Sequence, residues 1–183
     1  MKKAALLLLL IAILFTGCSD NIQLDFDNPH SKERSVTLDG EVITLPPQST
    51  VSLEVPRGEH SIKLANDSVI SYSFDEDMYL INPTMTDYVI EKIYFSVSGN
   101  PVLQATFNKA NRRTITFLGY EVQGNYEVFN DLIMARDWNY KQRQAVPEVI
   151  SVQKKKFSSS RNIRKLYAAD EFLLHLKEKK EQQ

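Results

Sequence analysis

The chain's one cysteine, Cys18, is the side chain whose position most clearly indicates a chemical fate. Two lysines precede an apolar run over residues 4–15, and Thr16 and Gly17 separate that run from the thiol. A positive start, a short apolar core and small residues at the end form a secretory signal. The run is shorter than the roughly 20 residues that a membrane-spanning helix needs. Residues 1–17 are therefore predicted to be a signal peptide that is removed.

Residues 14–18 (Leu-Phe-Thr-Gly-Cys) resemble the lipobox of bacterial lipoproteins, with Phe15 where that family usually has leucine. The resemblance implies cleavage before Cys18, which would carry the acyl chains that hold the protein on a membrane. Each methylene of an acyl chain that is buried in the membrane contributes about 0.8 kcal/mol to membrane binding, so two or three acyl chains form a lasting anchor. An aspartate after the cysteine favours the inner membrane in that family, so Ser19 implies the outer membrane. The alternatives are a plain secretory signal with a chance cysteine, or a buried N-terminal helix.

Trp138, the chain's one tryptophan, lies two residues before Tyr140 and is flanked by acidic and basic side chains. These rings could stack on a sugar or bind an anionic polymer, which would make the chain a carbohydrate-interacting protein or a hydrolase. The alternative is that Trp138 fills the core under a loop. A cleft with an exposed Trp138 beside two carboxylates would favour the first reading, and a buried ring would favour the second.

Lys154, Lys155 and Lys156 form a basic run that we expect to contact a partner. Residues 19–108 carry five basic and 14 acidic side chains, a net charge of −9, whereas residues 109–183 carry fifteen and nine, a net charge of +6. This asymmetry indicates two surfaces with different partners, two parts that attract each other, or ordinary salt pairing within one domain. Nucleic acid is not an expected partner of an exported chain.

No catalytic or metal-binding pattern stands out in the sequence. His30, His60 and His175 are far apart and lack the spacing of metal ligands. There is no Gly-x-Ser-x-Gly sequence and no phosphate-binding glycine loop among only six glycines. The acidic residues 75–77 lack the spacing of a calcium loop and are read as a turn. We therefore expect no cofactor, no metal and no catalytic residues, and a binding protein rather than an enzyme.

Apolar and polar residues alternate in short runs separated by turn residues over residues 22–74, which predicts strands. The first run, Ile22 to Asp27, is expected to be a half-buried strand. Asp39 and Gly40 separate two such runs and tolerate the positive φ angles of a tight hairpin turn. Short strands at this spacing indicate an antiparallel sandwich or barrel.

The later elements are less regular. The β-branched and aromatic run over residues 88–97 predicts a buried strand, although a helix starting near Thr86 remains an alternative. Residues 98–113 are expected to form a long loop. A second hairpin is expected to turn at Gly124 and Asn125, and residues 149–152 are expected to form a last strand.

The Asp39-Gly40 turn and the Gly-x-His-x-aliphatic sequence at residues 58–62 resemble the PEGA-type module of bacterial surface proteins. The resemblance extends over residues 22–74. It implies a small, non-catalytic β-sandwich on a cell surface and supplies no active-site residues.

The C-terminal segment has helical spacing from Arg161 onward, because Ile163, Leu166, Tyr167 and Leu173 fall on one face of a helix. We therefore predict a mainly β (α+β) chain, with an antiparallel β-sandwich-like domain followed by a C-terminal amphipathic helix.

The predicted organisation has four parts: a signal peptide (1–17), a lipidated Cys18 with a short tether (18–21), a β-rich domain (22–152), and a basic linker with the C-terminal helix (153–183). The β-rich domain could divide into a 22–74 sandwich module and a 75–152 extension. The leading hypothesis is a lipid-anchored protein of the cell envelope, on the outer membrane and facing the periplasm or the surface. It would be a non-catalytic binding, assembly or accessory component with an envelope protein as partner.

Overall fold

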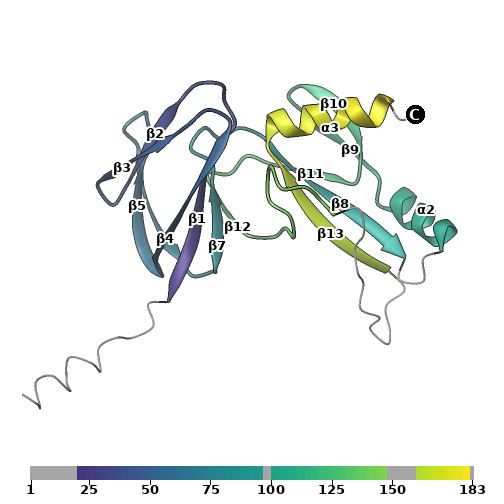
Figure 1. The fold of residues 1–183 in the computed structure, drawn as a ribbon, viewed down its shortest axis with the longest axis horizontal. Coiled ribbons are helices and arrows are strands. Elements are labelled where there is room, and N and C mark those ends of the chain that lie inside the picture. Colours follow the sequence, from purple (N-terminus) through teal and green to yellow (C-terminus); the bar gives the residue numbers. More distant parts are fainter. Residues whose placement is uncertain (1–19, 97–99, 148–159, 182–183) are drawn as a thin grey trace, which may run out of the picture.

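The computed structural model describes residues 20–96, 100–147 and 160–181. Figure 1 shows two β-rich halves side by side. The first half contains β1 (Asn21–Asn28), β2 (Arg34–Leu38), β3 (Glu41–Leu45), β4 (Ser49–Pro56), β5 (Gly58–Lys63), β6 (Val69–Phe74), β7 (Met78–Ile81) and β12 (Ile133–Ala135). The second contains β8 (Tyr88–Ser96), α2 (Pro101–Ala110), β9 (Arg113–Phe117), β10 (Tyr120–Gly124), β11 (Tyr126–Phe129), β13 (Ser160–Tyr167) and α3 (Ala169–Glu181). The prediction of a mainly β chain with antiparallel sheets and a C-terminal helix is confirmed.

The first half is a sandwich of two four-stranded sheets, with strand orders β12-β7-β1-β4 and β3-β2-β5-β6. The β1–β7 pair is parallel, and the other pairs in these two sheets are antiparallel. Apolar residues from both sheets form its core, among them Leu24, Phe26, Leu45, Ile62 and Phe74. The alternation of apolar and polar residues along β1 and β5 therefore correctly predicts which residues face this core.

Strand β1 is buried on both faces, so the prediction of a half-buried strand is wrong. Leu24 and Phe26 face the sandwich core, whereas Asp25 and Asp27 are 1% and 0% exposed and contact residues 141 and 143 of a later segment. Alternation shows that one face of a strand is polar, but it does not show whether that face meets water or protein.

The predicted hairpin at Asp39 and Gly40 is confirmed, since β2 and β3 pair antiparallel around these two residues with φ angles of 50° and 89°. Asp39 also contacts β5, which pairs with β2 in the same sheet. Its Oδ2 lies 2.6 Å from His60 Nδ1, and its Oδ1 accepts a hydrogen bond of 2.8 Å from the Ser61 amide. Burial alone would raise the pKa of Asp39, but the bonds from His60 and Ser61 lower it. The turn and the histidine sequence that carry the resemblance are thus joined in space.

The second half is built on the three-stranded sheet β11-β8-β13 and the β9–β10 hairpin. Helix α3 packs on one face of β8, and its Phe172 joins a cluster with Val89, Phe117, Tyr126 and Tyr167. The opposite face of the sheet packs against residues that belong to the sandwich. The prediction of a strand over residues 88–97 is confirmed for β8.

The prediction of a helix from Arg161 is wrong over its first part, because β13 occupies that stretch and α3 begins at Ala169. All eight residues of β13 pair with β8. Ile163 and Lys165 lie on one face and Leu166 on the other, and all three are buried. A strand buried on both faces has no alternation, and a 3-and-4 spacing then imitates a helix.

Two further predictions are corrected. Residues 98–113 contain α2 rather than a loop alone, and its N-cap, Asn100, accepts hydrogen bonds from the Val102 and Leu103 amides. Asn followed by Pro is a helix start that was available in the sequence. The hairpin after α2 turns at Leu118 and Gly119, which have φ angles of 49° and 82°, because β9 pairs with β10.

The halves do not follow one another in sequence, because β7 and β12 share a sheet with β1 and β4. The chain leaves the sandwich after β7, returns to add β12 as its edge strand, and crosses again to β13 (Figure 1). The predicted strand at residues 149–152 lies outside the described residues. In the part of the chain that is described, no helix is both long and apolar enough to cross a membrane.

Candidate functional site

A groove of about 580 Å³ lies between the β9–β10 hairpin and α3. Its apolar lining comes from both walls: Phe117, Tyr120 and Val122 from the hairpin, and Leu173 and Leu176 from the helix. Tyr120 is 73% exposed and Leu173 is 48% exposed, so large apolar side chains remain open to solvent at this groove. Apolar hollows of 300–1,000 Å³ with a few polar groups are typical ligand sites.

The rim of this groove is mainly basic, with Arg112, Lys177, Lys179 and Lys180 against the single carboxylate of Glu121. The last turn of α3 contains Lys179 and Lys180. Cations at the C-terminus of a helix are favoured by its dipole, and the same charges also give the groove a positive potential.

Helix α3 is held in position by aromatic contacts beneath the groove. Phe172 is fully buried, and its ring lies 5.0 Å from the ring centroids of both Phe117 and Tyr126 in edge-on geometry. Such pairs contribute about 0.5–1.5 kcal/mol beyond the burial of their area. The shape of the groove therefore depends on this docking.

Glu91 of β8 forms a second, charged attachment of α3. Its Oε1 accepts a hydrogen bond of 2.6 Å from Lys179 Nζ, and its Oε2 accepts one of 3.1 Å from the Tyr167 hydroxyl. His175 Nε2 lies 3.0 Å from the same Oε2. Burial alone would raise the pKa of Glu91, but His175 and Lys179 lower it to about 2. Lys179 is thus already paired within the protein.

We expect acid to loosen α3 through Glu91. A glutamate carboxyl whose pKa is about 2 in the folded protein, below its ordinary value of 4.5, contributes stability that is fully present above pH 4.5 and is lost as the pH falls toward 2. The contribution is on the order of 3 kcal/mol. Urea unfolding of Glu91→Gln should therefore show a free energy that depends less on pH across this window.

The matched control is Glu178→Gln, one exposed carboxylate of the same helix. It should keep the pH dependence of the wild type. An equal slope in wild type and Glu91→Gln between pH 5 and pH 2 would contradict the assigned role of Glu91.

A buried polar network joins the two halves at β1. Asp27 Oδ1 accepts hydrogen bonds of 2.6 Å from both Thr50 Oγ1 and Arg143 Nη1, and its Oδ2 accepts a short one from the Tyr88 hydroxyl. Asp25 accepts a bond of 2.9 Å from Lys141 Nζ. Burial raises the pKa of Asp27 even though Arg143 and the hydrogen bonds lower it.

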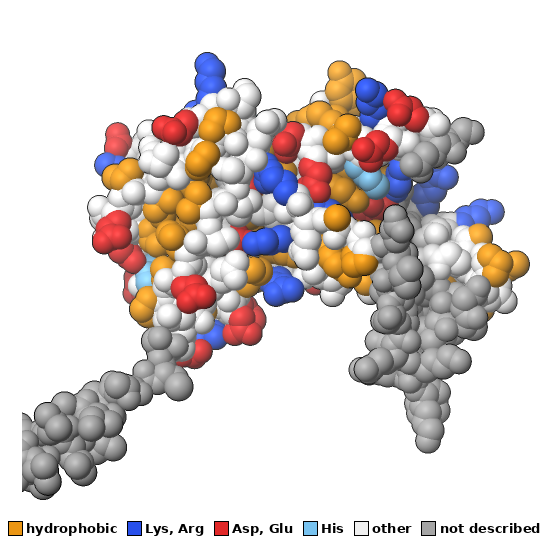
Figure 2. Space-filling view, in the orientation of Figure 1, with side chains coloured by type: hydrophobic (Ala, Val, Ile, Leu, Met, Phe, Trp, Pro, Cys, Tyr) orange, Lys and Arg blue, Asp and Glu red, His pale blue; other side chains and the backbone are white. Residues whose placement is uncertain are grey.

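The network continues to the start of α3. Lys165 Nζ lies 2.6 Å from Glu171 Oε1 and also donates to the Lys141 carbonyl at 2.8 Å. The other carboxylate oxygen of Glu171 accepts a bond of 2.9 Å from the Arg143 amide. Figure 2 shows Lys and Arg side chains lying between the two halves. The acidic first part and the basic second part of the chain thus attract each other, one of the three alternatives for the charge asymmetry.

Trp138 lies inside the protein, at 6% exposed, in a cluster with Leu80, Tyr88, Ile90 and Leu166. A hollow of about 320 Å³ borders it, but the side chain belongs to a buried apolar cluster. Tyr140 is half-buried, and its backbone amide and carbonyl bond to Arg164 and Leu166. This position favours the reading in which Trp138 fills the core, and it gives no support to sugar stacking.

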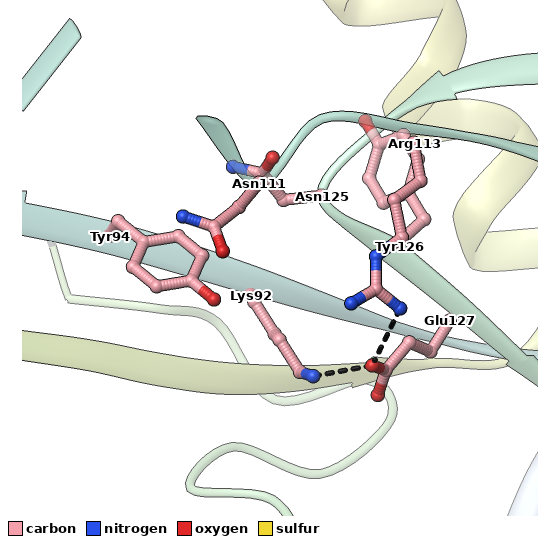
Figure 3. A pocket seen from close by; sticks show the side chains of 7 residues that line it. All are labelled: Lys92, Tyr94, Asn111, Arg113, Asn125, Tyr126 and Glu127. Atoms are coloured by element: carbon pink, nitrogen blue, oxygen red, sulfur yellow. Dashed lines mark hydrogen bonds and ion pairs between the residues drawn. The ribbon is translucent and has the colours of Figure 1, made fainter. Parts of the chain in front are cut away.

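A third cluster, drawn in Figure 3, surrounds Glu127. Lys92 and Arg113 point at its carboxylate, with Arg113 Nη1 at 3.6 Å, and Arg164 Nη2 lies 3.3 Å from its other oxygen. The cavity beside this cluster has only about 10 Å³. These charges satisfy one another and leave no room for a ligand.

Two sets of predicted site residues lie outside the described residues: Cys18, and the run Lys154, Lys155 and Lys156. Within the described ranges, no group of three or more His, Cys, Asp or Glu side chains could hold a metal ion. The groove at α3 was not predicted from the sequence. Its signal was the apolar residues Leu173 and Leu176 beside lysines, a pattern that is equally typical of an ordinary amphipathic helix.

Comparisons with protein-family models, with curated proteins and with solved structures gave no match. Any assignment of function therefore depends on the residues and their geometry.

Proposed function

We propose that the chain is a lipid-anchored protein of the cell envelope that acts by binding another molecule in the groove at α3. It is a non-catalytic binding or assembly component, and the acyl chains on Cys18 hold it on the outer membrane. The observation that carries the binding role is the groove itself, with its exposed apolar lining and basic rim.

The anchor is supported by the lipobox-like residues 14–18 and by the start of the fold. Strand β1 begins at Asn21, three residues after Cys18. Three extended residues span roughly 10 Å, which keeps the sandwich near the headgroups. Figure 1 shows the start of β1 at the lower edge of the sandwich and α3 at the upper edge of the other half. A ligand or an envelope protein partner would then reach the groove from the side away from the anchor.

The anchor is tested by the mass of the protein isolated from membranes of a bacterium that processes lipoproteins. We expect residues 1–17 to be absent and Cys18 to carry a diacylglycerol with or without a further acyl chain. Cys18→Ser should lose the lipid mass and leave the membrane fraction after mild detergent-free washing, whereas Ser19→Ala should keep both. A chain that retains Met1 and an unmodified Cys18 would refute the anchor.

A further inference from the structure

The groove at α3 combines two features that one ligand could satisfy together. Its floor and walls are apolar, from Phe117 and Val122 on the hairpin and Leu176 on the helix. Apolar area that is removed from water contributes about 25 cal/mol per Å². An acyl or similar chain laid along these side chains would gain this contribution, and Tyr120 and Leu173 at the opening would cover it.

Most of the basic side chains at the rim form no ion pair within the described residues. Lys179 is paired with Glu91, but among the described residues no ion pair is formed by Arg112, Lys177 or Lys180. Lys177 and Lys180 are three positions apart on α3 and so lie on neighbouring parts of one face. Three free cations against one carboxylate, Glu121, leave an excess of positive charge at the rim.

We propose that this groove binds a fatty acid, with the acyl chain between α3 and the β9–β10 hairpin and the carboxylate among Lys177, Lys180 and Arg112. The charge complementarity of the rim selects an anionic head, and the apolar walls select a chain. The inference rests on the proposed binding role of the groove and is independent of the anchor at Cys18.

The volume and charge of the groove decide against two other occupants. About 580 Å³ is the size of a small-molecule site rather than of an extended peptide-binding surface. The segment over residues 153–156 of the chain itself contains three lysines and would be repelled by the same rim.

The test is a fluorescence titration of the full chain carrying Cys18→Ser with 11-(dansylamino)undecanoic acid, a fatty acid with a fluorescent tail. Oleate should displace the probe, whereas dodecyltrimethylammonium and inorganic phosphate should not. Lys177→Glu with Lys180→Glu should weaken probe binding at least tenfold. The matched control, Lys32→Glu with Arg34→Glu, changes the charge equally on an exposed part of the sandwich and should leave affinity unchanged.

A second variant tests the apolar part without touching the core. Tyr120→Ser with Leu173→Gln alters two exposed side chains and should weaken the probe about tenfold while the unfolding midpoint stays the same. The proposal would be overturned if dodecyltrimethylammonium displaced the probe as well as oleate does. It would also be overturned if Lys177→Glu with Lys180→Glu left the affinity for the probe unchanged. Displacement by phosphate alone, or binding of an acidic peptide with no response to oleate, would overturn it too. Each of these results leaves the mass of the Cys18 peptide, and thus the anchor, unaffected.

Discussion

Replacement of Asp27 with leucine is expected to destabilise the protein by about 3 to 5 kcal/mol, the cost of removing one partner of a buried ion pair. Asp27 is fully buried, and it accepts hydrogen bonds from Thr50, Arg143 and Tyr88. Leucine would leave all three donors without their acceptor in the junction between the halves. Urea unfolding followed by tryptophan fluorescence measures the change, because Trp138 lies on the same side of β8 as Tyr88.

Two further variants separate hydrogen bonding from charge. Asp27→Asn keeps one oxygen acceptor for Thr50 or Tyr88 but leaves Arg143 without a carboxylate, so it should cost less than leucine, about 1 to 3 kcal/mol. Asp77→Asn removes an exposed carboxylate paired with Arg57 and should leave the free energy of unfolding close to that of the wild type. A stability of Asp27→Leu within 1 kcal/mol of wild type would show that the network does not join the halves.

Replacement of Phe172 with alanine is expected to cost about 3 to 5 kcal/mol, as for other large aromatic side chains removed from a core. The ring is 0% exposed and touches Phe117 from the hairpin and Tyr126 from β11. Its loss should release α3 from the sheet, so limited proteolysis should cut the chain near Ala169 faster than in the wild type. Because α3 forms one wall of the groove, probe binding should be lost with it.

The neighbouring residue supplies the control for this variant. Leu173 is 48% exposed, so Leu173→Ala should change the free energy of unfolding by less than about 0.5 kcal/mol. If protease cuts Phe172→Ala near α3 no faster than it cuts Leu173→Ala, the Phe172 ring does not hold the helix on the sheet.

The sequence was informative where one face of a strand meets solvent and the other a core. The β2–β3 hairpin was predictable because Asp39 and Gly40 tolerate positive φ and alternating strands flank them. The prediction failed where elements are buried on both sides. In β13, Lys165 is only 2% exposed because Glu171 and two carbonyls satisfy its ammonium group, and no local pattern indicates such partners.

The candidate site was less predictable than the fold. The charges around Trp138 allow two readings from the sequence, a ligand-binding ring or a ring that fills the core, and its buried cluster favours the second. The groove at α3 needs Arg112, Tyr120 and Lys177 to meet. They come from the connection before β9, from β10 and from α3, and the packing of α3 on the hairpin depends on Phe172. Long-range pairings such as Asp27 with Arg143 are likewise invisible to spacing rules, since 116 positions separate the two residues.

The most direct test of the binding role is a crystal structure of the chain carrying Cys18→Ser, grown with oleate. The account predicts electron density for an acyl chain along Phe117, Val122 and Leu176, ending in a carboxylate near Lys177 and Lys180. Density for oleate elsewhere on the molecule, or an empty groove at a saturating concentration, would contradict it.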